Sequence, residues 1–148
     1  MAYVAVVGPG EAGPDERQTA EEVGRRLAQA GAIIVCGGLG GVMAAACRGA
    51  RAAGGTTVGI LPGTDRAEAN EWVTIAFPTG LGELRNGLVV RAADVVIAIG
   101  GGAGTLSEIG LALKTGVPVL GLRTWEIDGV EALGDAAAAV RRALELAD

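Results

Sequence analysis

The sequence predicts an α/β protein in which one doubly wound, mainly parallel sheet carries helices on both faces. Short β-branched runs alternate along the chain with longer segments rich in Ala, Leu and Arg. The runs are almost entirely apolar, as expected of parallel strands that are covered on both faces, and right-handed crossovers then place helices on the two sides. A length of 148 residues is typical of one domain, so we expect residues 1–148 to form a single domain.

Hydrophobic periodicity and turn residues locate the expected elements. Strands are predicted near residues 2–7, 32–36, 56–61, 72–77, 95–99 and 117–122. Helices are predicted near residues 15–30, 41–53, 82–93, 105–115 and 134–147. Because the carboxyl ends of parallel strands meet at one edge, the glycine-rich segments that follow the strands should share that edge, where open α/β sheets bind ligands.

Composition excludes several function classes. The chain has no His, one Ser and one Lys, so Ser-His-Asp triads, Cys-His nucleophiles and His-based metal sites are excluded, and we expect no metal site. A net charge of −5 and 3% aromatic residues argue against a nucleic-acid partner. No apolar run is long enough to cross a bilayer and no signal peptide is visible, so we expect no membrane partner and a cytoplasmic location. Cys36 and Cys47 lack a metal-site or redox-motif spacing, so we expect two small buried apolar residues.

The first two glycine loops are expected to belong to a ligand site. GPGEAG matches the dinucleotide-binding glycine pattern, but Pro14 and Asp15 predict a helix that starts after the third glycine, so we do not expect a classical NAD site. The loop still contributes Gly10 and Glu11 to the shared edge. In the second loop, close approach of a ligand to the backbone would explain the glycines. The expected site residues of this segment are Gly37, Gly38, Gly40, Gly41 and Met43.

The strongest signal lies in IGGGAGTLSE. Thr105 as N-cap and Glu108 three residues later would form a capping box, which explains both residues through helix stability alone. A capping box does not need the preceding glycines, whereas an anion bound to exposed amides at a helix start does. A phosphate there would be repelled by Glu108 on contact, so that carboxylate should face another part of the ligand, such as a sugar. Arg85, expected in the first turn of its helix, suggests an anionic ligand because a cation there opposes the helix dipole.

With these residues identified, the chain resembles a Rossmann-like group often labelled as lysine decarboxylases, which includes the LONELY GUY phosphoribohydrolases and the molybdenum-cofactor carrier proteins. The group's P-G-G-x-G-T-x-x-E signature corresponds to residues 100–108, with Gly100 in place of Pro. An Arg-Lys pair nine positions before an Asp corresponds to Arg85 and Asp94, with Asn86 in place of Lys. The GGLGGVM, GARAAGGTTVGILPG and LKTGVPVLGL stretches are also similar, and the combination is most similar to the carrier branch.

The resemblance implies a nucleotide- or phosphate-binding site. Gly101, Gly102, Gly104 and Thr105 would hold a phosphate, Arg85 and Asn86 would face the sugar-phosphate region, and Glu108 would lie near the ribose. In the hydrolases a carboxylate and an Arg assist cleavage of the base–ribose bond, so Glu108 and Arg85 would be the catalytic pair. Pyridoxal-phosphate decarboxylation is not expected, because the single Lys, Lys114, lies about two turns from the glycine edge. The resemblance also implies a homo-oligomer, either a dimer or a tetramer.

Three functional hypotheses remain open. The first is a carrier that binds the molybdenum cofactor or a nucleotide without turnover and needs no other cofactor. The second is a phosphoribohydrolase that converts nucleoside 5′-monophosphates, such as cytokinin riboside monophosphates, to free base and ribose 5-phosphate. The third is a scaffold whose glycine turns serve packing only.

Overall fold

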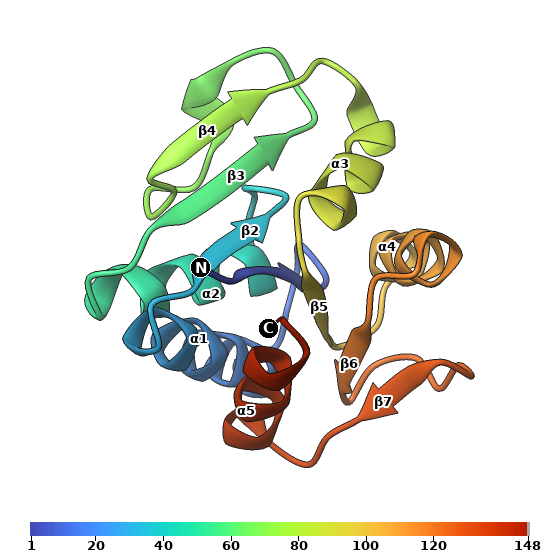
Figure 1. The fold of residues 1–148 in the computed structure, drawn as a ribbon. Helices are drawn as coiled ribbons and strands as arrows, with labels where there is room; N and C mark the ends of the chain where they lie inside the picture. Colours follow the sequence, from blue (N-terminus) through green and yellow to red (C-terminus); the bar gives the residue numbers. More distant parts are fainter. Residues whose placement is uncertain (148) are drawn as a thin grey trace.

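A computed structural model describes residues 1–147 and contains one seven-stranded parallel sheet, which confirms the predicted fold class (Figure 1). The strands are β1 (Tyr3–Val7), β2 (Ile33–Cys36), β3 (Thr57–Leu61), β4 (Ile75–Pro78), β5 (Val95–Ile99), β6 (Val119–Leu122) and β7 (Val130–Ala132). They lie in the order β4-β3-β2-β1-β5-β6-β7, so the chain moves outward in one direction from β1 and in the other from β5. The boundary between β1 and β5 is the switch point at which such sheets bind ligands.

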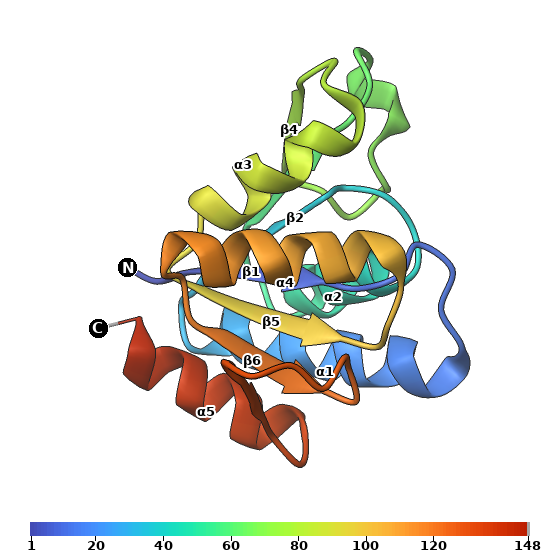
Figure 2. The ribbon, with the colours of Figure 1, turned by 90° about the vertical axis from the view of Figure 1, so that its right-hand side faces the viewer.

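Helices cover both faces of the sheet. The helices are α1 (Pro14–Gln29), α2 (Val42–Ala52), α3 (Asn86–Arg91), α4 (Ala103–Thr115) and α5 (Ala136–Leu146), with short 3-10 helices η1 (Arg66–Glu68) and η2 (Gly82–Arg85). Helices α1, α2 and α5 pack on one face, and α3 and α4 pack on the other (Figure 1). Figure 2 shows that the carboxyl ends of the strands and the start of α4 lie at one edge, with both termini at the opposite edge.

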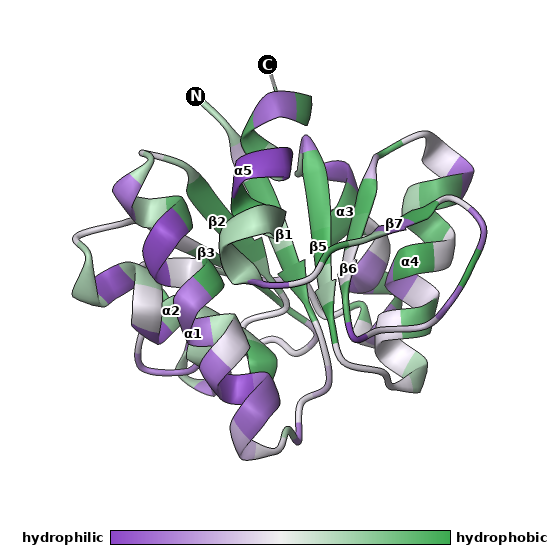
Figure 3. Ribbon diagram, turned by 90° about the horizontal axis from the view of Figure 1, so that it is seen from below, coloured by the Kyte–Doolittle hydropathy of each residue, from purple (hydrophilic) through white to green (hydrophobic). Residues whose placement is uncertain are grey.

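The apolar strands supply two cores, one on each face. In β1, Val4 and Val6 point into the core under α1, α2 and α5, whereas Ala5 and Val7 point into the core under α3 and α4. Figure 3 shows the strands as a hydrophobic layer between the two sets of helices. Because both faces of the strand are buried, alternation of polar and apolar residues is absent, as the sequence predicts.

Two glycines let α1 and α2 pack closely. A Cβ at Gly24 would lie 2.0 Å from the Ala46 carbonyl oxygen, and one at Gly49 would lie 2.0 Å from the Glu21 carbonyl oxygen. The loop after β1 leads into α1 and the loop after β2 leads into α2, so the close packing of the two helices fixes the positions of both loops.

The prediction for the cysteines is confirmed. Cys36 and Cys47 are free and fully buried, with their sulfur atoms 3.5 Å apart. They pack with Met43, Leu39 and Trp72 beneath the second glycine loop.

The structure corrects several element boundaries. The strand predicted at 72–77 begins only at Ile75, because the side chains of Thr57 and Asn70 bond to the backbone of residues 72–74. The segment predicted as one helix at 82–93 forms η2 and α3 instead, and Gly82, the first residue of η2, has a left-handed φ of 59° that a regular α-helix does not accommodate. Strand β7 was not predicted, because three residues with two exposed side chains carry too little pattern.

None of the helices in residues 1–147 is both long enough and apolar enough to cross a membrane.

Candidate functional site

A cleft of about 360 Å³ opens at the carboxyl edge beside the switch point. Its walls come from the loops after β1, β2 and β5, from the junction of η2 and α3, and from the first turns of α4. Eight of the fourteen predicted site residues line it, namely Gly10, Met43, Arg85, Asn86, Gly102, Gly104, Thr105 and Glu108. The fold thus gathers predicted site residues from four stretches of the chain, and the most distant of them, Gly10 and Glu108, are 98 positions apart.

The predicted capping box at Thr105 and Glu108 is wrong. Helix α4 begins at Ala103 with Gly102 as its N-cap, so Thr105 and Glu108 are its third and sixth residues. Gly102 has no side chain, and no side chain caps the first amides of the helix. The first four amides of an α-helix lack partners within the helix, so this N-terminus offers uncapped donors to the cleft.

Thr105 provides the most direct sign of a missing partner. The residue is 2% exposed, and its Oγ1 is buried without a hydrogen-bond partner among the described residues. Burying a hydroxyl without a partner costs about 1–3 kcal/mol. Such groups are rare in folded proteins and need an explanation, and a ligand in the cleft that Thr105 lines would supply the partner.

Arg85 lies where the sequence predicts a cation, and backbone carbonyls hold its guanidinium in place. Nε donates to the Ile60 carbonyl at 2.8 Å, and Nη2 donates to the Gly37 carbonyl at 3.4 Å. A Cβ at Gly37 would lie 2.6 Å from Nη2, so this glycine makes room for the arginine. Arg85 is only 9% exposed, which makes it a fixed positive charge in the cleft wall.

Asn86 connects Arg85 to α4. Its Oδ1 accepts from Arg85 Nη1, and its Nδ2 donates to Ser107 Oγ at 2.9 Å. Ser107 Oγ in turn donates to the Gly104 carbonyl at 2.8 Å in the first turn of α4. Asn86 is therefore a neutral bridge between two walls of the cleft.

Glu108 is the acidic residue of the cleft. It is 7% exposed, and burial raises the pKa of its carboxyl from 4.5 to about 7, an increase that the Arg85 charge partly opposes. No ion pair within 4.0 Å joins the two side chains in residues 1–147. At neutral pH a large share of Glu108 is protonated, which removes much of the repulsion that a bound phosphate would otherwise meet.

The other six predicted residues do not line the cleft. Gly38 packs against Leu61 with a φ of 80°, and Gly40 and Gly41 approach the backbone of the first loop. The remaining three are Gly37 behind Arg85, Gly101 beside Trp125, and the exposed Glu11. The glycines of the second loop thus serve close packing of neighbouring loops, while Leu39 and Met43 from that segment reach the cleft.

Sequence reasoning missed four lining residues, Gly8, Pro9, Leu39 and Ala103. Pro9, Leu39 and Ala103 are adjacent to predicted glycines, so their position in the sequence was the one available signal. Their side chains carry no polar or charged group that would mark a site. Helix α1 begins at Pro14, after the third glycine of the first loop, as the argument against a classical NAD site requires.

Gly100 stands where the P-G-G-x-G-T-x-x-E signature has proline, and its backbone conformation accounts for this difference. Its φ is 72°, a left-handed conformation that proline, fixed near −65°, does not adopt. A Cβ there would also lie 1.8 Å from a carboxylate oxygen of Glu16. The loop before α4 therefore follows a path that is not open to a chain with the signature proline.

Comparisons with known proteins give a family match and a relative of similar sequence. The model of the SLOG cluster4 family matches residues 1–146. An uncharacterized protein of Archaeoglobus fulgidus is 40% identical over 123 residues, which are 83% of this chain and 81% of the relative.

Solved structures with similar folds include a molybdenum cofactor binding protein and a molybdenum cofactor carrier protein. The molybdenum cofactor binding protein of Rippkaea orientalis superposes with a TM-score of 0.93 and 35% identity, covering 98% of this chain and 96% of that one. The molybdenum cofactor carrier protein of Chlamydomonas reinhardtii gives a TM-score of 0.88 and 34% identity, covering 98% and 97%. DNA processing protein A of Helicobacter pylori, at 22% identity and a TM-score of 0.77 over 99% and 82% of the two chains, shares the fold alone.

Proposed function

This chain belongs to the SLOG cluster4 family, and we propose that it binds and carries a phosphate-bearing small ligand, the molybdenum cofactor, in the cleft at the start of α4. The observation that carries the proposal is the buried hydroxyl of Thr105, which lacks a partner directly beside the uncapped amides of that helix. Arg85 adds a positive charge to the same cleft. The similarity to molybdenum cofactor binding and carrier proteins supports this ligand over a nucleotide.

In this proposal the ligand phosphate binds at Gly102, Gly104 and Thr105. The free amides of the first turn and the Thr105 hydroxyl are donors, and a phosphate offers acceptor oxygens. Arg85 faces the same anion, and Asn86 keeps the arginine and α4 in register through its two hydrogen bonds. Because the carbonyls of Ile60 and Gly37 already hold the guanidinium, binding requires little reordering of that side chain.

Thermal unfolding with candidate ligands tests the proposal. Molybdopterin, the metal-free phosphorylated pterin, should stabilise the protein by about 2.7 kcal/mol at one hundred times its dissociation constant, which is about 5–10 °C in Tm. The comparison ligands are AMP, GMP and inorganic phosphate. Absence of any shift with molybdopterin at high concentration would contradict the carrier proposal, and a shift with AMP or GMP alone would favour the nucleotide as ligand.

Thr105→Val identifies the site. Valine keeps the shape of threonine and removes the orphaned hydroxyl, so the free energy of unfolding should stay equal or rise while affinity for molybdopterin falls about tenfold or more. Thr115→Val is the matched control, because it makes the same substitution at the far end of α4, where the Thr115 hydroxyl donates to the Leu111 carbonyl outside the cleft. Unchanged affinity in Thr105→Val would remove the phosphate from this helix start.

A second function, N-glycosidic hydrolysis of nucleoside 5′-monophosphates, is favoured by Glu108. Its pKa of about 7 suits proton donation at neutral pH, and Arg85 lies on the same cleft. Incubation with AMP or N6-substituted AMP should then release free base, and Glu108→Gln should abolish the release. If no base is released at high enzyme concentration, the carrier function stands alone.

We also propose that the chain assembles as a homo-oligomer through the outer surface of η2, α3 and α4. Leu84 is 78% exposed, and Leu88 and Leu111 are exposed on the adjacent helices. Helix α4 exposes one charged side chain, Lys114, whereas α1 carries seven charged residues. Exposed apolar surface of this kind is typical of protein interfaces.

A further inference from the structure

Three consecutive residues after β6 have features that the fold does not explain. Arg123 has a φ of 51°, the one positive φ outside glycine among residues 1–147. The next residue, Thr124, has a buried Oγ1 without a hydrogen-bond partner in the same part of the chain. Trp125 is 42% exposed, although the sequence contains only four aromatic residues. Backbone strain, orphaned hydroxyls and exposed aromatic rings concentrate at binding sites.

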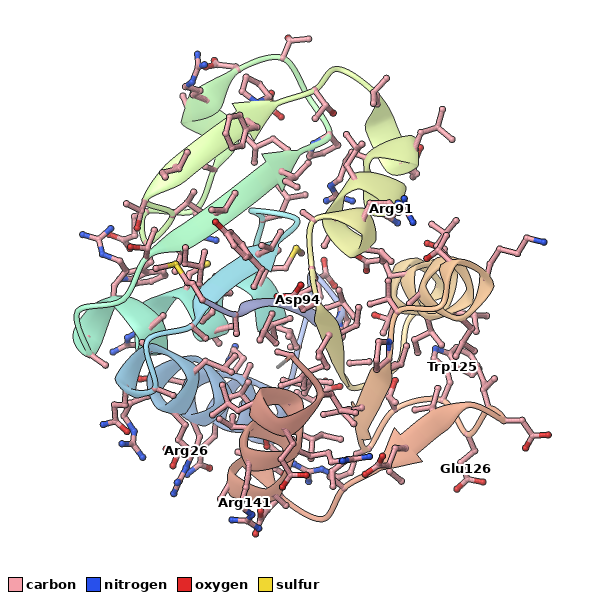
Figure 4. All side chains as sticks on the ribbon, in the orientation of Figure 1. Arg26, Arg91, Asp94, Trp125, Glu126 and Arg141 are labelled. Atoms are coloured by element: carbon pink, nitrogen blue, oxygen red, sulfur yellow. The ribbon has the colours of Figure 1, made fainter. Side chains whose placement is uncertain are left out.

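Trp125 lies against the glycine loop that bounds the cleft. Its Nε1 donates to the Gly102 carbonyl at 3.1 Å, and its ring lies 3.6 Å from where a Cβ of Gly101 would be. Figure 4 shows Trp125 between α4 and β7, while Glu126 lies on the other side of β7. Gly101, between Trp125 and the cleft, is exposed and has no side chain, so its backbone is accessible.

The other tryptophan has a complete environment. Trp72 packs with the Cys36 and Cys47 cluster, and the Arg48 guanidinium lies 5.8 Å from the centre of its ring. Within residues 1–147, no cation lies over the ring of Trp125. An exposed indole next to bare glycine backbone is a surface on which a flat ring can stack.

We propose that Trp125 contacts the ligand, stacking on its planar heteroaromatic ring while the ligand phosphate lies at the start of α4. This inference rests on the proposed function and adds the position of the ring to it. The ligand crosses the exposed backbone of Gly101, with its phosphate on the Thr105 side and its ring on the Trp125 side. A phosphate-bearing pterin or purine has the required chemistry, namely an anionic end and a flat ring at the other end. Stacking on an aromatic side chain contributes about 1–3 kcal/mol for a nucleic-acid base, or roughly 5- to 150-fold in affinity.

Two variants and two probes separate stacking from mere support of the loop. Affinities for molybdopterin and for inorganic phosphate are measured by calorimetry in the wild type, Trp125→Leu and Trp125→Phe. If Trp125 stacks on the ring, Trp125→Leu should lose at least about fivefold in molybdopterin affinity and keep its phosphate affinity, while Trp125→Phe, which keeps an aromatic ring, should bind molybdopterin within about threefold of wild type. Thermal unfolding without ligand shows whether each variant is folded.

Several results would overturn the inference. Equal losses for molybdopterin and phosphate in Trp125→Leu would show that Trp125 only supports the loop. Equal molybdopterin losses in the Leu and Phe variants would assign the effect to the Nε1 hydrogen bond with Gly102. If molybdopterin binds the wild type and all variants alike, the ring does not reach Trp125 and the proposed function is unaffected. If the wild type binds neither probe, the proposed function fails and the inference fails with it.

Fluorescence gives an independent measurement. In Trp72→Phe, Trp125 is the one remaining tryptophan, and its emission should be quenched as molybdopterin binds, with a midpoint equal to the calorimetric dissociation constant. Inorganic phosphate should leave the emission unchanged. Saturable molybdopterin binding without a change in Trp125 emission would contradict stacking.

Discussion

At the scale of single residues, Glu108 determines how the protein should respond to pH. Its pKa is about 7 in the folded protein and near 4.5 for an ordinary carboxyl, because burial disfavours the charged form. Between these two values the folded protein holds a proton that the unfolded chain releases. Stability contributed by the protonated form is therefore lost as the pH rises from 4.5 to 7, by about 3 kcal/mol in total.

Glu108→Gln makes this dependence measurable. Glutamine is neutral at every pH, so the free energy of unfolding of the variant relative to wild type should increase by about 2.5 kcal/mol between pH 5 and pH 8. Urea unfolding at the two pH values measures it, and the comparison between variant and wild type cancels the titration of the other carboxylates. A difference that does not change with pH would mean that Glu108 titrates normally in the folded protein.

The same residue illustrates an ambiguity of sequence reasoning. Thr105 and Glu108 have the spacing of a capping box, but the spacing has that meaning only if the helix begins after Thr105. The helix begins at Ala103 with Gly102 as N-cap, three residues before the predicted N-cap at Thr105, although Ala103 and Gly104 have no side chain that marks a start. The glycines correctly indicated exposed amides at the start of the helix. Thr105 and Glu108 were assigned to a capping box because the predicted start of α4 was misplaced.

At the scale of elements, the second glycine loop is held against the first by close backbone contact. Gly41 has a φ of 60°, and a Cβ there would lie 2.2 Å from the Pro9 carbonyl oxygen. Gly41→Ala should therefore lower the free energy of unfolding by about 2 kcal/mol or more, because both the conformation and the contact oppose a side chain. Urea unfolding measures the change.

Gly110→Ala is the matched control. Gly110 lies within α4, and nothing lies within 4 Å of the position of its Cβ. Alanine there should raise the free energy of unfolding by about 0.5–1 kcal/mol, because glycine is a poor helix former. If Gly41→Ala were as stable as wild type, the close packing of the two loops would be refuted.

Elements were predicted best where the burial pattern is strong. The strands β1 and β5 lie within the predicted ranges because all-apolar strands of a parallel sheet carry an unmistakable pattern. The segment around β4 was predicted less accurately. Asn70 bonds locally to the backbone of Trp72, while Thr57, on the neighbouring strand, bonds to the backbone of Trp72 and Thr74. Such tertiary contacts leave no periodic signal.

At the scale of the whole molecule, the contrast between the two outer surfaces leads to a prediction about assembly. Leu84→Glu combined with Leu88→Glu places two charges on the apolar surface of η2 and α3 and should convert the proposed homo-oligomer to a monomer, as measured by light scattering after size exclusion. Gln18→Glu on the exposed side of α1 is the control and should leave the mass unchanged. Equal masses for the double variant and wild type would place the interface elsewhere.

The sequence by itself determined the doubly wound parallel sheet, the glycine-rich edge and the three residue types that dominate the cleft, Arg85, Thr105 and Glu108. The sheet and the glycine-rich edge follow from local patterns of hydrophobicity and glycine, and the three residues were identified from their spacing and from the family resemblance. Only the tertiary structure decided where α4 begins, that Thr105 lacks a partner, that burial raises the pKa of Glu108, and that Trp125 lies against Gly101 and Gly102. These properties arise from burial and from contacts between residues far apart in sequence, which no local pattern encodes.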